Sequence, residues 1–294
     1  MSASKLTLMA VHAHPDDEAT SGGGALMRYQ ADGVQTVLVT CTNGEEGEIH
    51  DPDLVEEEAR PRLGQIRQEE LRRATEIMRI SAAELLNYRD SGMVGTPPNE
   101  NPESFHKADM REATGKLVKL VRKYQPQVMF TYNSFGGYGH PDHIKAHKIS
   151  IAAFDDAANT RKYPEAEFGP AWQPSKLYTT AWGRGSWLKV WELLVEQGRP
   201  WPFQREGMPT VDENNPPEFG SPDNEITTQI DVSDYFKELR RALFEHRTQI
   251  DPNHPWVKTR EEFAPILSGN ESFILFKSTI PAQRPEYDLF AGLR

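Results

Sequence analysis

Two short stretches of the sequence concentrate side chains that can bind a metal ion or transfer a proton. The first reads His-Ala-His-Pro-Asp-Asp-Glu and places His14, Asp16 and Asp17 directly after an apolar run at 6–11. At a strand-to-helix junction, His14 and Asp17 could converge on one point because they are three residues apart, while Asp16 between them stays free for other work. Pro15 suits the first turn of a helix, where its missing N–H costs nothing.

The second stretch reads Gly-Gly-Tyr-Gly-His-Pro-Asp-His and places Tyr138, His140, Asp142 and His143 after an apolar run at 128–132. Here too a strand is expected to lead into a loop and then into a helix that begins with a proline. Ligands of open α/β sheets bind at the carboxyl ends of the strands. The two stretches are therefore expected to face each other across one crevice.

His14, Asp17 and His143 together form a set of two histidines and one carboxylate that leaves coordination positions open. This composition is typical of a catalytic Zn²⁺ or Fe²⁺ ion, whereas structural zinc sites are closed and usually contain thiolates. We expect His147 to be an ordinary helix residue and His12 to be a core residue or to support the site from behind.

Strand and helix patterns alternate through the first half of the chain, which indicates a mostly parallel sheet with helices on both faces. The expected fold class is α/β, a Rossmann-like three-layer sandwich. The first strand is not followed by the Gly-x-Gly-x-x-Gly run of dinucleotide-binding proteins, so the site differs from theirs. The expected strands are 6–11, 34–41, 84–88, 128–132 and 177–182, and the expected helices are 24–31, 61–80, 111–124 and 141–154.

The pattern changes in the second half of the chain. Residues 199–223 are rich in Pro, Gly and Asn, which predicts a long surface loop. A strand at 226–231 and a helix at 232–246 are expected after it. We therefore expect a Rossmann-like catalytic core at 1–182 and a smaller C-terminal cap at 183–294 that packs on the core.

The composition narrows the class of protein. The 294 residues include 33 Lys and Arg against 44 Asp and Glu, a net charge of −11 that works against nucleic-acid binding. The sequence has no apolar run long enough to span a membrane. The single cysteine, Cys41, cannot form an internal disulfide, which suits a reducing compartment. We expect a cytoplasmic protein with a small-molecule ligand and no nucleic-acid or membrane partner; whether it forms a homo-oligomer is left open.

Residues 13–18, Ala-His-Pro-Asp-Asp-Glu, and residues 139–143, Gly-His-Pro-Asp-His, closely resemble the motifs of the PIG-L/LmbE-like family of metal-dependent N-deacetylases and amidases. The resemblance extends over most of the chain, including 226–232 and 246–250. Within the family the chain is most similar to the enzymes that deacetylate N-acetylglucosaminyl-inositol and to those that cleave the amide of mycothiol S-conjugates. The resemblance implies a Rossmann-like fold, in agreement with the strand and helix pattern.

The resemblance also implies roles for ten residues. They are the metal ligands His14, Asp17 and His143, the general base Asp16, the oxyanion-binding residues His140 and Tyr138, Asp142 as the residue that orients His140, and the sugar-binding residues Glu48, Arg67 and Asp90. Glu48 and the run Arg-Asp-Ser-Gly-Met at 89–93 are similar to the deacetylases. Ser21 stands where the resemblance to the conjugate amidases would require a lysine.

The implied activity is removal of an N-acetyl group from an N-acetylglucosaminyl substrate by a metal-activated water. Asp16 would take the proton of this water and pass it to the departing amine. Tyr138 and a protonated His140 would hold the oxyanion, and the Asp142 carboxylate would favour the imidazolium form of His140.

Other functions remain open at this stage. The chain could cleave thiol S-conjugate amides or deacetylate another small molecule that contains N-acetylglucosamine. A sugar- or nucleotide-binding module without catalysis would be expected to lack some of the carboxylates or ligands that this chain retains. A two-metal phosphoesterase would need more than the three clear ligands found here.

Overall fold

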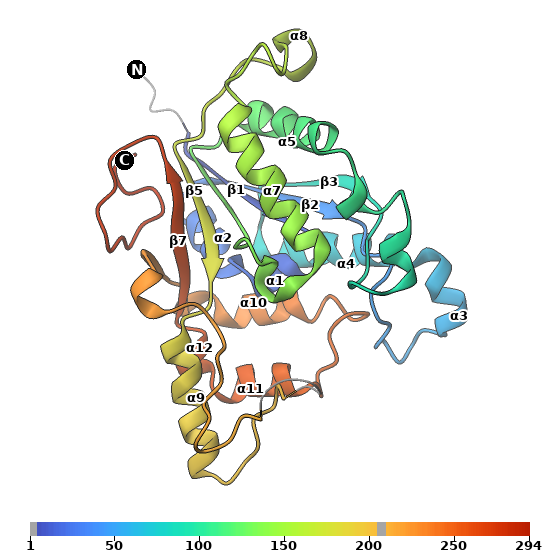
Figure 1. Cartoon of the computed structure of the whole chain (residues 1–294), viewed down its shortest axis with the longest axis vertical. Helices are drawn as coiled ribbons and strands as arrows, with labels where there is room; N and C mark the ends of the chain where they lie inside the picture. Colours follow the sequence, from blue (N-terminus) through green and yellow to red (C-terminus); the bar gives the residue numbers. More distant parts are fainter. Residues whose placement is uncertain (1–4, 205–209) are drawn as a thin grey trace.

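The computed structural model describes residues 5–204 and 210–294. One seven-stranded sheet, in the order β3-β2-β1-β4-β5-β7-β6, runs through the molecule (Figure 1). Its strands are β1 Thr7–His12, β2 Gln35–Thr42, β3 Ala82–Tyr88, β4 Val128–Thr131, β5 Lys176–Ala181, β6 Thr228–Asp231 and β7 Asn270–Ser278. Strands β1 to β5 pair in parallel, while β7 is antiparallel to both β5 and β6. The expected α/β fold with a mostly parallel sheet is confirmed.

Helices lie on both sides of this sheet. They are α1 Asp17–Thr20, α2 Gly23–Ala31, α3 Glu56–Ala59, α4 Leu63–Met78, α5 Met110–Tyr124, α6 Gly136–Gly139, α7 Pro141–Asp156, α8 Glu165–Phe168, α9 Arg184–Glu196, α10 Phe236–Leu243, α11 Pro255–Glu262 and α12 Ala264–Leu267. Alternate residues of β1 face opposite sides, because successive side chains of a strand point in opposite directions. Met9 and Val11 pack in the core under α5 and α7, while Leu8 and Ala10 pack in the core under α2, α4 and α10.

The C-terminal region does more than cover the sheet. Strands β6 and β7 belong to the main sheet, and β7 lies between β5 and β6. Helices α9 and α12 contribute to a third apolar cluster around Trp187 and Trp201, apart from the sheet. The division into a core at 1–182 and a cap at 183–294 stays a prediction, although part of the expected cap completes the sheet of the expected core.

The described residues of 199–222 form neither a helix nor a strand, as their Pro and Gly content predicts. The helix expected at 232–246 is shorter than predicted, because α10 begins only at Phe236 and is preceded by a 3-10 turn at Ser233–Tyr235. Across 5–204 and 210–294, no helix is both long and apolar enough to cross a membrane.

Candidate metal-binding active site

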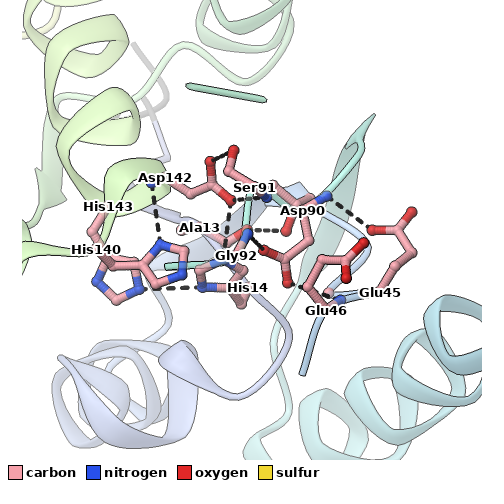
Figure 2. A network of polar contacts seen from close by, with 12 residues as sticks. Ala13, His14, Glu45, Glu46, Asp90, Ser91, Gly92, His140, Asp142 and His143 are labelled. Carbon is pink, nitrogen blue, oxygen red and sulfur yellow. Dashed lines mark hydrogen bonds and ion pairs between the residues drawn. The ribbon is translucent and has the colours of Figure 1, made fainter. Parts of the chain in front are cut away.

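The two motifs meet because β1 and β4 are neighbours in the sheet and run in the same direction. His14 follows β1, and the chain then turns into α1. His140 is the N-cap residue of α7, whose first turn contains Pro141 and His143. Figure 2 shows the rings of His14, His140 and His143 gathered in one place, with two carboxylates beside His14.

His14, Asp17 and His143 place three possible metal-binding atoms close together. Nδ1 of His14 lies 3.2 Å from Nε2 of His143. Oδ2 of Asp17 lies 3.5 Å from Nδ1 of His14, and Oδ1 of Asp17 lies 3.5 Å from Nε2 of His143. Ligands of a tetrahedral zinc with bonds of 2.0–2.1 Å are separated by about 3.3 Å. These three buried side chains form a triad that has the spacing and chemistry of a three-residue metal site.

His140 lies at the same point. Its ring centroid is 4.5 Å from that of His14 and 5.2 Å from that of His143. One ring nitrogen from each of the three imidazoles lies within 4.8 Å of the chosen nitrogens of the other two. His140 is therefore close enough either to serve as a further ligand or to contact a group bound at the triad.

The second ring nitrogen of His14 faces carboxylates. Its Nε2 lies 3.3 Å from Oδ2 of Asp142 and 3.6 Å from Oδ1 of Asp90. Metal-binding histidines commonly donate their other N–H to a carboxylate, which fixes the orientation of the ring. Asp142 is itself fixed, since its carboxylate accepts hydrogen bonds from the Ser91 backbone N–H at 2.9 Å and from the Ser91 hydroxyl.

The role of the Asp142 carboxylate in orienting His140 stays a prediction. That carboxylate is turned toward His14 and Ser91, and it is the backbone N–H of Asp142 that donates to Nδ1 of His140 at 3.2 Å. Burial, followed by the nearby His14 and His143, lowers the pKa of His140 to about 2. Nδ1 of His140 accepts the Asp142 N–H, and the imidazolium form expected during the reaction stays a prediction.

Asp16 directly precedes the proposed ligand Asp17 in the sequence. Its side chain is 22% exposed, and its Oδ2 accepts a 3.0 Å hydrogen bond from Arg67. Burial raises the pKa of Asp16 to about 7, against the lowering effect of Arg67. A general base is most effective when its pKa is near the working pH, so this carboxylate suits proton transfer.

Arg67 is buried on α4 and serves the loops around the site. Besides Asp16, it donates to the carbonyl oxygens of Pro15 at 2.6 Å and Gly44 at 2.8 Å. The arginine was expected to bind a sugar, and that role stays a prediction. In the structure its hydrogen bonds go to the candidate base and to the backbone around it.

The other two expected sugar-binding residues differ in position. Asp90 is buried beside His14, and its Oδ1 accepts the Gly92 N–H at 2.9 Å. The carboxylate of Glu48 is 80% exposed and pairs with His50 at 2.7 Å. The structure therefore brings Asp90 to the triad and leaves the Glu48 side chain at the surface of its loop.

Tyr138 lies near two of the site histidines. It is 48% exposed, and its ring centroid is 5.0 Å from that of His143 and 6.1 Å from that of His140. The loop that carries it contains Gly137 with a φ of 76°, a conformation that glycine adopts without strain.

Two contacts near the triad were not predicted. The ring of Tyr132, at the end of β4, stacks on His143 with centroids 4.1 Å apart, and its hydroxyl accepts the Ala13 N–H at 2.7 Å. Glu18, the last acid of the first motif, pairs with His246 at 2.6 Å. The sequence signals for the second contact are the position of Glu18 in the first motif and the inclusion of 246–250 in the resemblance.

Comparisons with known proteins identify a family and relatives that are similar to this chain. A family model described as "PIG-L: GlcNAc-PI de-N-acetylase" matches residues 9–154, which contain both motifs. A mycothiol S-conjugate amidase from Streptomyces coelicolor is 38% identical, over 99% of this chain and 98% of its own length. A 1D-myo-inositol 2-acetamido-2-deoxy-alpha-D-glucopyranoside deacetylase from Thermobifida fusca is 39% identical, over 97% of this chain and 98% of its own length.

A solved structure supports the fold. The N,N'-diacetylchitobiose deacetylase from Pyrococcus horikoshii is similar with a TM-score of 0.62 at 18% identity, over 93% of this chain and 84% of that chain. The amidase from Streptomyces coelicolor and the deacetylase from Thermobifida fusca are enzymes that cleave amide bonds. Their similarity to this chain extends over nearly its whole length. The chain therefore belongs to the PIG-L family of metal-dependent N-deacetylases and amidases.

Proposed function

We propose that this protein is a zinc-dependent hydrolase that removes the acetyl group from an N-acetylglucosaminyl-inositol-like substrate. The observation that carries this proposal is the triad of His14, Asp17 and His143, with the partly buried carboxylate of Asp16 one residue before Asp17. The full-length similarity to deacetylases named for such a substrate supports the choice of sugar.

Zn²⁺ is the proposed ion, with Fe²⁺ as the alternative. His14, Asp17 and His143 would hold it, because two imidazole nitrogens and one carboxylate are ligands that both ions accept while coordination positions stay open. The bound ion would supply a water of lowered pKa and polarise the amide carbonyl.

The remaining chemistry belongs to the side chains around the triad. Asp16 would accept a proton from the attacking water and return it to the departing amine. His140 would donate through Nε2, since its Nδ1 already accepts the backbone N–H of Asp142. Tyr138 and His140 are thus the proposed hydrogen-bond donors to the oxyanion of the tetrahedral intermediate.

Cleavage of thiol S-conjugate amides is the second candidate, because the amidase from Streptomyces coelicolor is 38% identical over 99% of this chain. The two activities both break an amide bond and differ in the acyl group that is attached to the amine. A panel that contains the acetylated glucosaminyl-inositol, S-conjugates with the glucosaminyl amide, and a small acetamide separates them by the release of free amine. We expect the highest kcat/KM for the acetylated sugar; a higher value for the S-conjugates would favour the amidase.

Two substitutions test the assigned roles. Asp16→Asn is expected to keep one zinc per chain and to lower kcat by about a hundredfold or more, because it removes the base and no ligand. His143→Ala is expected to lose zinc. Zinc content by elemental analysis and initial rates check both, and loss of zinc from Asp16→Asn would make Asp16 a ligand instead of the base.

A further inference from the structure

Asp16 has an unusual backbone conformation. Its φ is 124° and its ψ is −26°, immediately before α1. The other non-glycine residues with positive φ in the described part of the chain, Arg79, Asn87 and Gln125, lie between 50° and 56°, inside the left-handed region. A residue held outside the usual regions is strained and persists only where surrounding contacts enforce its conformation.

Those contacts hold Asp16 from two sides. On one side, Arg67 donates to its carboxylate and to the carbonyl of Pro15. On the other side, the backbone N–H of Asp16 donates to Oε2 of Glu18 at 3.0 Å. The backbone of the candidate base is therefore held by the Glu18 side chain, which accepts its N–H.

Glu18 is positioned in turn by the C-terminal region. Its Oε1 lies 2.6 Å from Nε2 of His246, which is 228 residues away in the sequence. Both side chains are fully buried. Burial of a carboxylate is costly without a charged or hydrogen-bonding partner, so His246 is what makes Glu18 tolerable at this position.

A purely structural tie between the same segments already exists next to this pair. Glu70 accepts hydrogen bonds from the N–H of Thr248 at 2.8 Å and from its hydroxyl at 2.6 Å. This contact anchors 246–250 to α4 without touching Asp16. Glu18 differs from Glu70 because its second oxygen binds the backbone of the candidate base.

We propose that Glu18 and His246 are positioning residues that hold the strained backbone of Asp16 and thereby keep its carboxylate in place for proton transfer. This inference rests on the proposed role of Asp16 as general base. It assigns a part in the reaction to the C-terminal segment that contains His246, because misplacement of a reacting group by about 1 Å can cost a hundredfold in rate.

The test compares Glu18→Ala, Glu18→Gln and the control Thr248→Val, each in the zinc-loaded protein and each alone or with Asp16→Asn. We expect Glu18→Ala to lower kcat by about 10- to 100-fold with KM and zinc content unchanged. Glu18→Gln should recover most of the activity, because an amide oxygen can still accept the Asp16 N–H. Thr248→Val should stay within about twofold of the parent, since it weakens only the parallel tie.

Measurements in the Asp16→Asn background decide whether Glu18 positions Asp16 or only stabilises the fold. If Glu18 acts through the Asp16 carboxylate, Glu18→Ala should change kcat by less than about twofold in that background, because residues that act as a unit are not additive. An equal loss in both backgrounds, or loss of zinc, overturns the proposal. His246→Gln provides the same comparison if Glu18→Ala does not fold.

The outcomes also separate this inference from the proposed function. If Asp16→Asn lowers kcat as expected while Glu18→Ala and His246→Gln keep the parent kcat, only the positioning role fails. If Asp16→Asn keeps the parent kcat, the base assignment fails and the positioning role fails with it.

Discussion

Arg67 illustrates how tertiary contacts change the interpretation of a single residue. The residue is 2% exposed, and its guanidinium donates to Asp16, to Pro15 and to Gly44. A surface arginine could turn freely toward a substrate, whereas this one has most of its donors committed to the protein. The sugar-binding role implied by the resemblance is therefore joined by a role in holding the candidate base and the loop at Gly44.

Arg67→Ala is accordingly expected to lower kcat/KM for both the acetylated sugar and a small acetamide. The loss should correspond to about 1–3 kcal/mol, because buried carbonyl oxygens and the Asp16 carboxylate are left without a donor. Steady-state kinetics on the two substrates check this. Arg89→Ala is a control, since Arg89 pairs with Glu46 at a partly exposed position. A loss confined to the sugar would show that Arg67 acts only by binding substrate.

At the level of elements, the end of β4 supports the first turn of α7. Tyr132 directly follows β4, stacks on His143 and accepts the N–H of Ala13. Ala13 follows β1, so one side chain links the carboxyl ends of two neighbouring strands and the helix that contributes a proposed ligand. Burial and the nearby Asp17 carboxylate raise the pKa of the Tyr132 hydroxyl, which keeps it protonated and able to donate a hydrogen bond.

Tyr132→Phe is expected to weaken zinc binding by about 10- to 100-fold, the usual effect of losing a group that orients metal ligands. The ring and its stacking on His143 are retained, so the change isolates the hydroxyl. Competition with a chromogenic chelator measures the zinc affinity. Tyr163→Phe is the control, because Tyr163 is buried in the core and its hydroxyl contacts the carbonyl of Arg111. Equal affinities for Tyr132→Phe and the parent would contradict the prediction.

At the scale of the whole molecule, the C-terminal tail is joined to the sheet by a buried polar cluster. Nζ of Lys176 on β5 lies 2.6 Å from Oε1 of Glu286, and the hydroxyl of Tyr178 donates to Oε2 of Glu286 at 2.6 Å. The Lys176 and Glu286 side chains are 0% and 3% exposed. The tail that contains Leu289 and Phe290 therefore completes the core under α2 and α4.

Lys176→Met is expected to lower the free energy of unfolding by about 3–5 kcal/mol, because it leaves the buried Glu286 carboxylate without its charged partner. Denaturant-induced unfolding followed by circular dichroism measures this change. The double variant Lys176→Met, Glu286→Gln should recover part of the loss, since the unpaired charge is removed as well. A single variant as stable as the parent would mean that the pair is not required for folding.

Removal of the metal by a chelator is expected to leave the protein folded. Two apolar cores on opposite faces of a seven-stranded sheet do not depend on one ion, unlike small zinc domains that unfold without it. Far-UV circular dichroism and a cooperative thermal transition check this after chelation, and activity should return when zinc is added back. Loss of the far-UV signal on chelation would contradict the expectation.

Several elements could be predicted from local pattern. The apolar runs before the two motifs became β1 and β4, and the helix expected at 141–154 became α7. Strand β7 and helices α9 and α11 are not predicted from the sequence, because local pattern marks the ends of helices and strands poorly in the expected cap. Whether a segment such as β7 joins a sheet depends on a free strand edge elsewhere, which local sequence does not reveal.

The sequence by itself determined which residues could do the chemistry: two motifs at the ends of two strands, with His14, Asp17 and His143 as a proposed ligand set and Asp16 as a free carboxylate. Their convergence followed from local rules, since parallel strands end at one edge of a sheet and a helix turn brings residues three apart together.

Only the tertiary structure decided what each of these residues contacts. The Asp142 carboxylate contacts His14 and Ser91, Arg67 on α4 donates to Asp16, and Glu18 pairs with His246. These contacts span from 51 to 228 residues of sequence. Which residues pair at such separations depends on how the elements pack and on which buried charges need a partner. The spacing of residues within a motif determines neither of these.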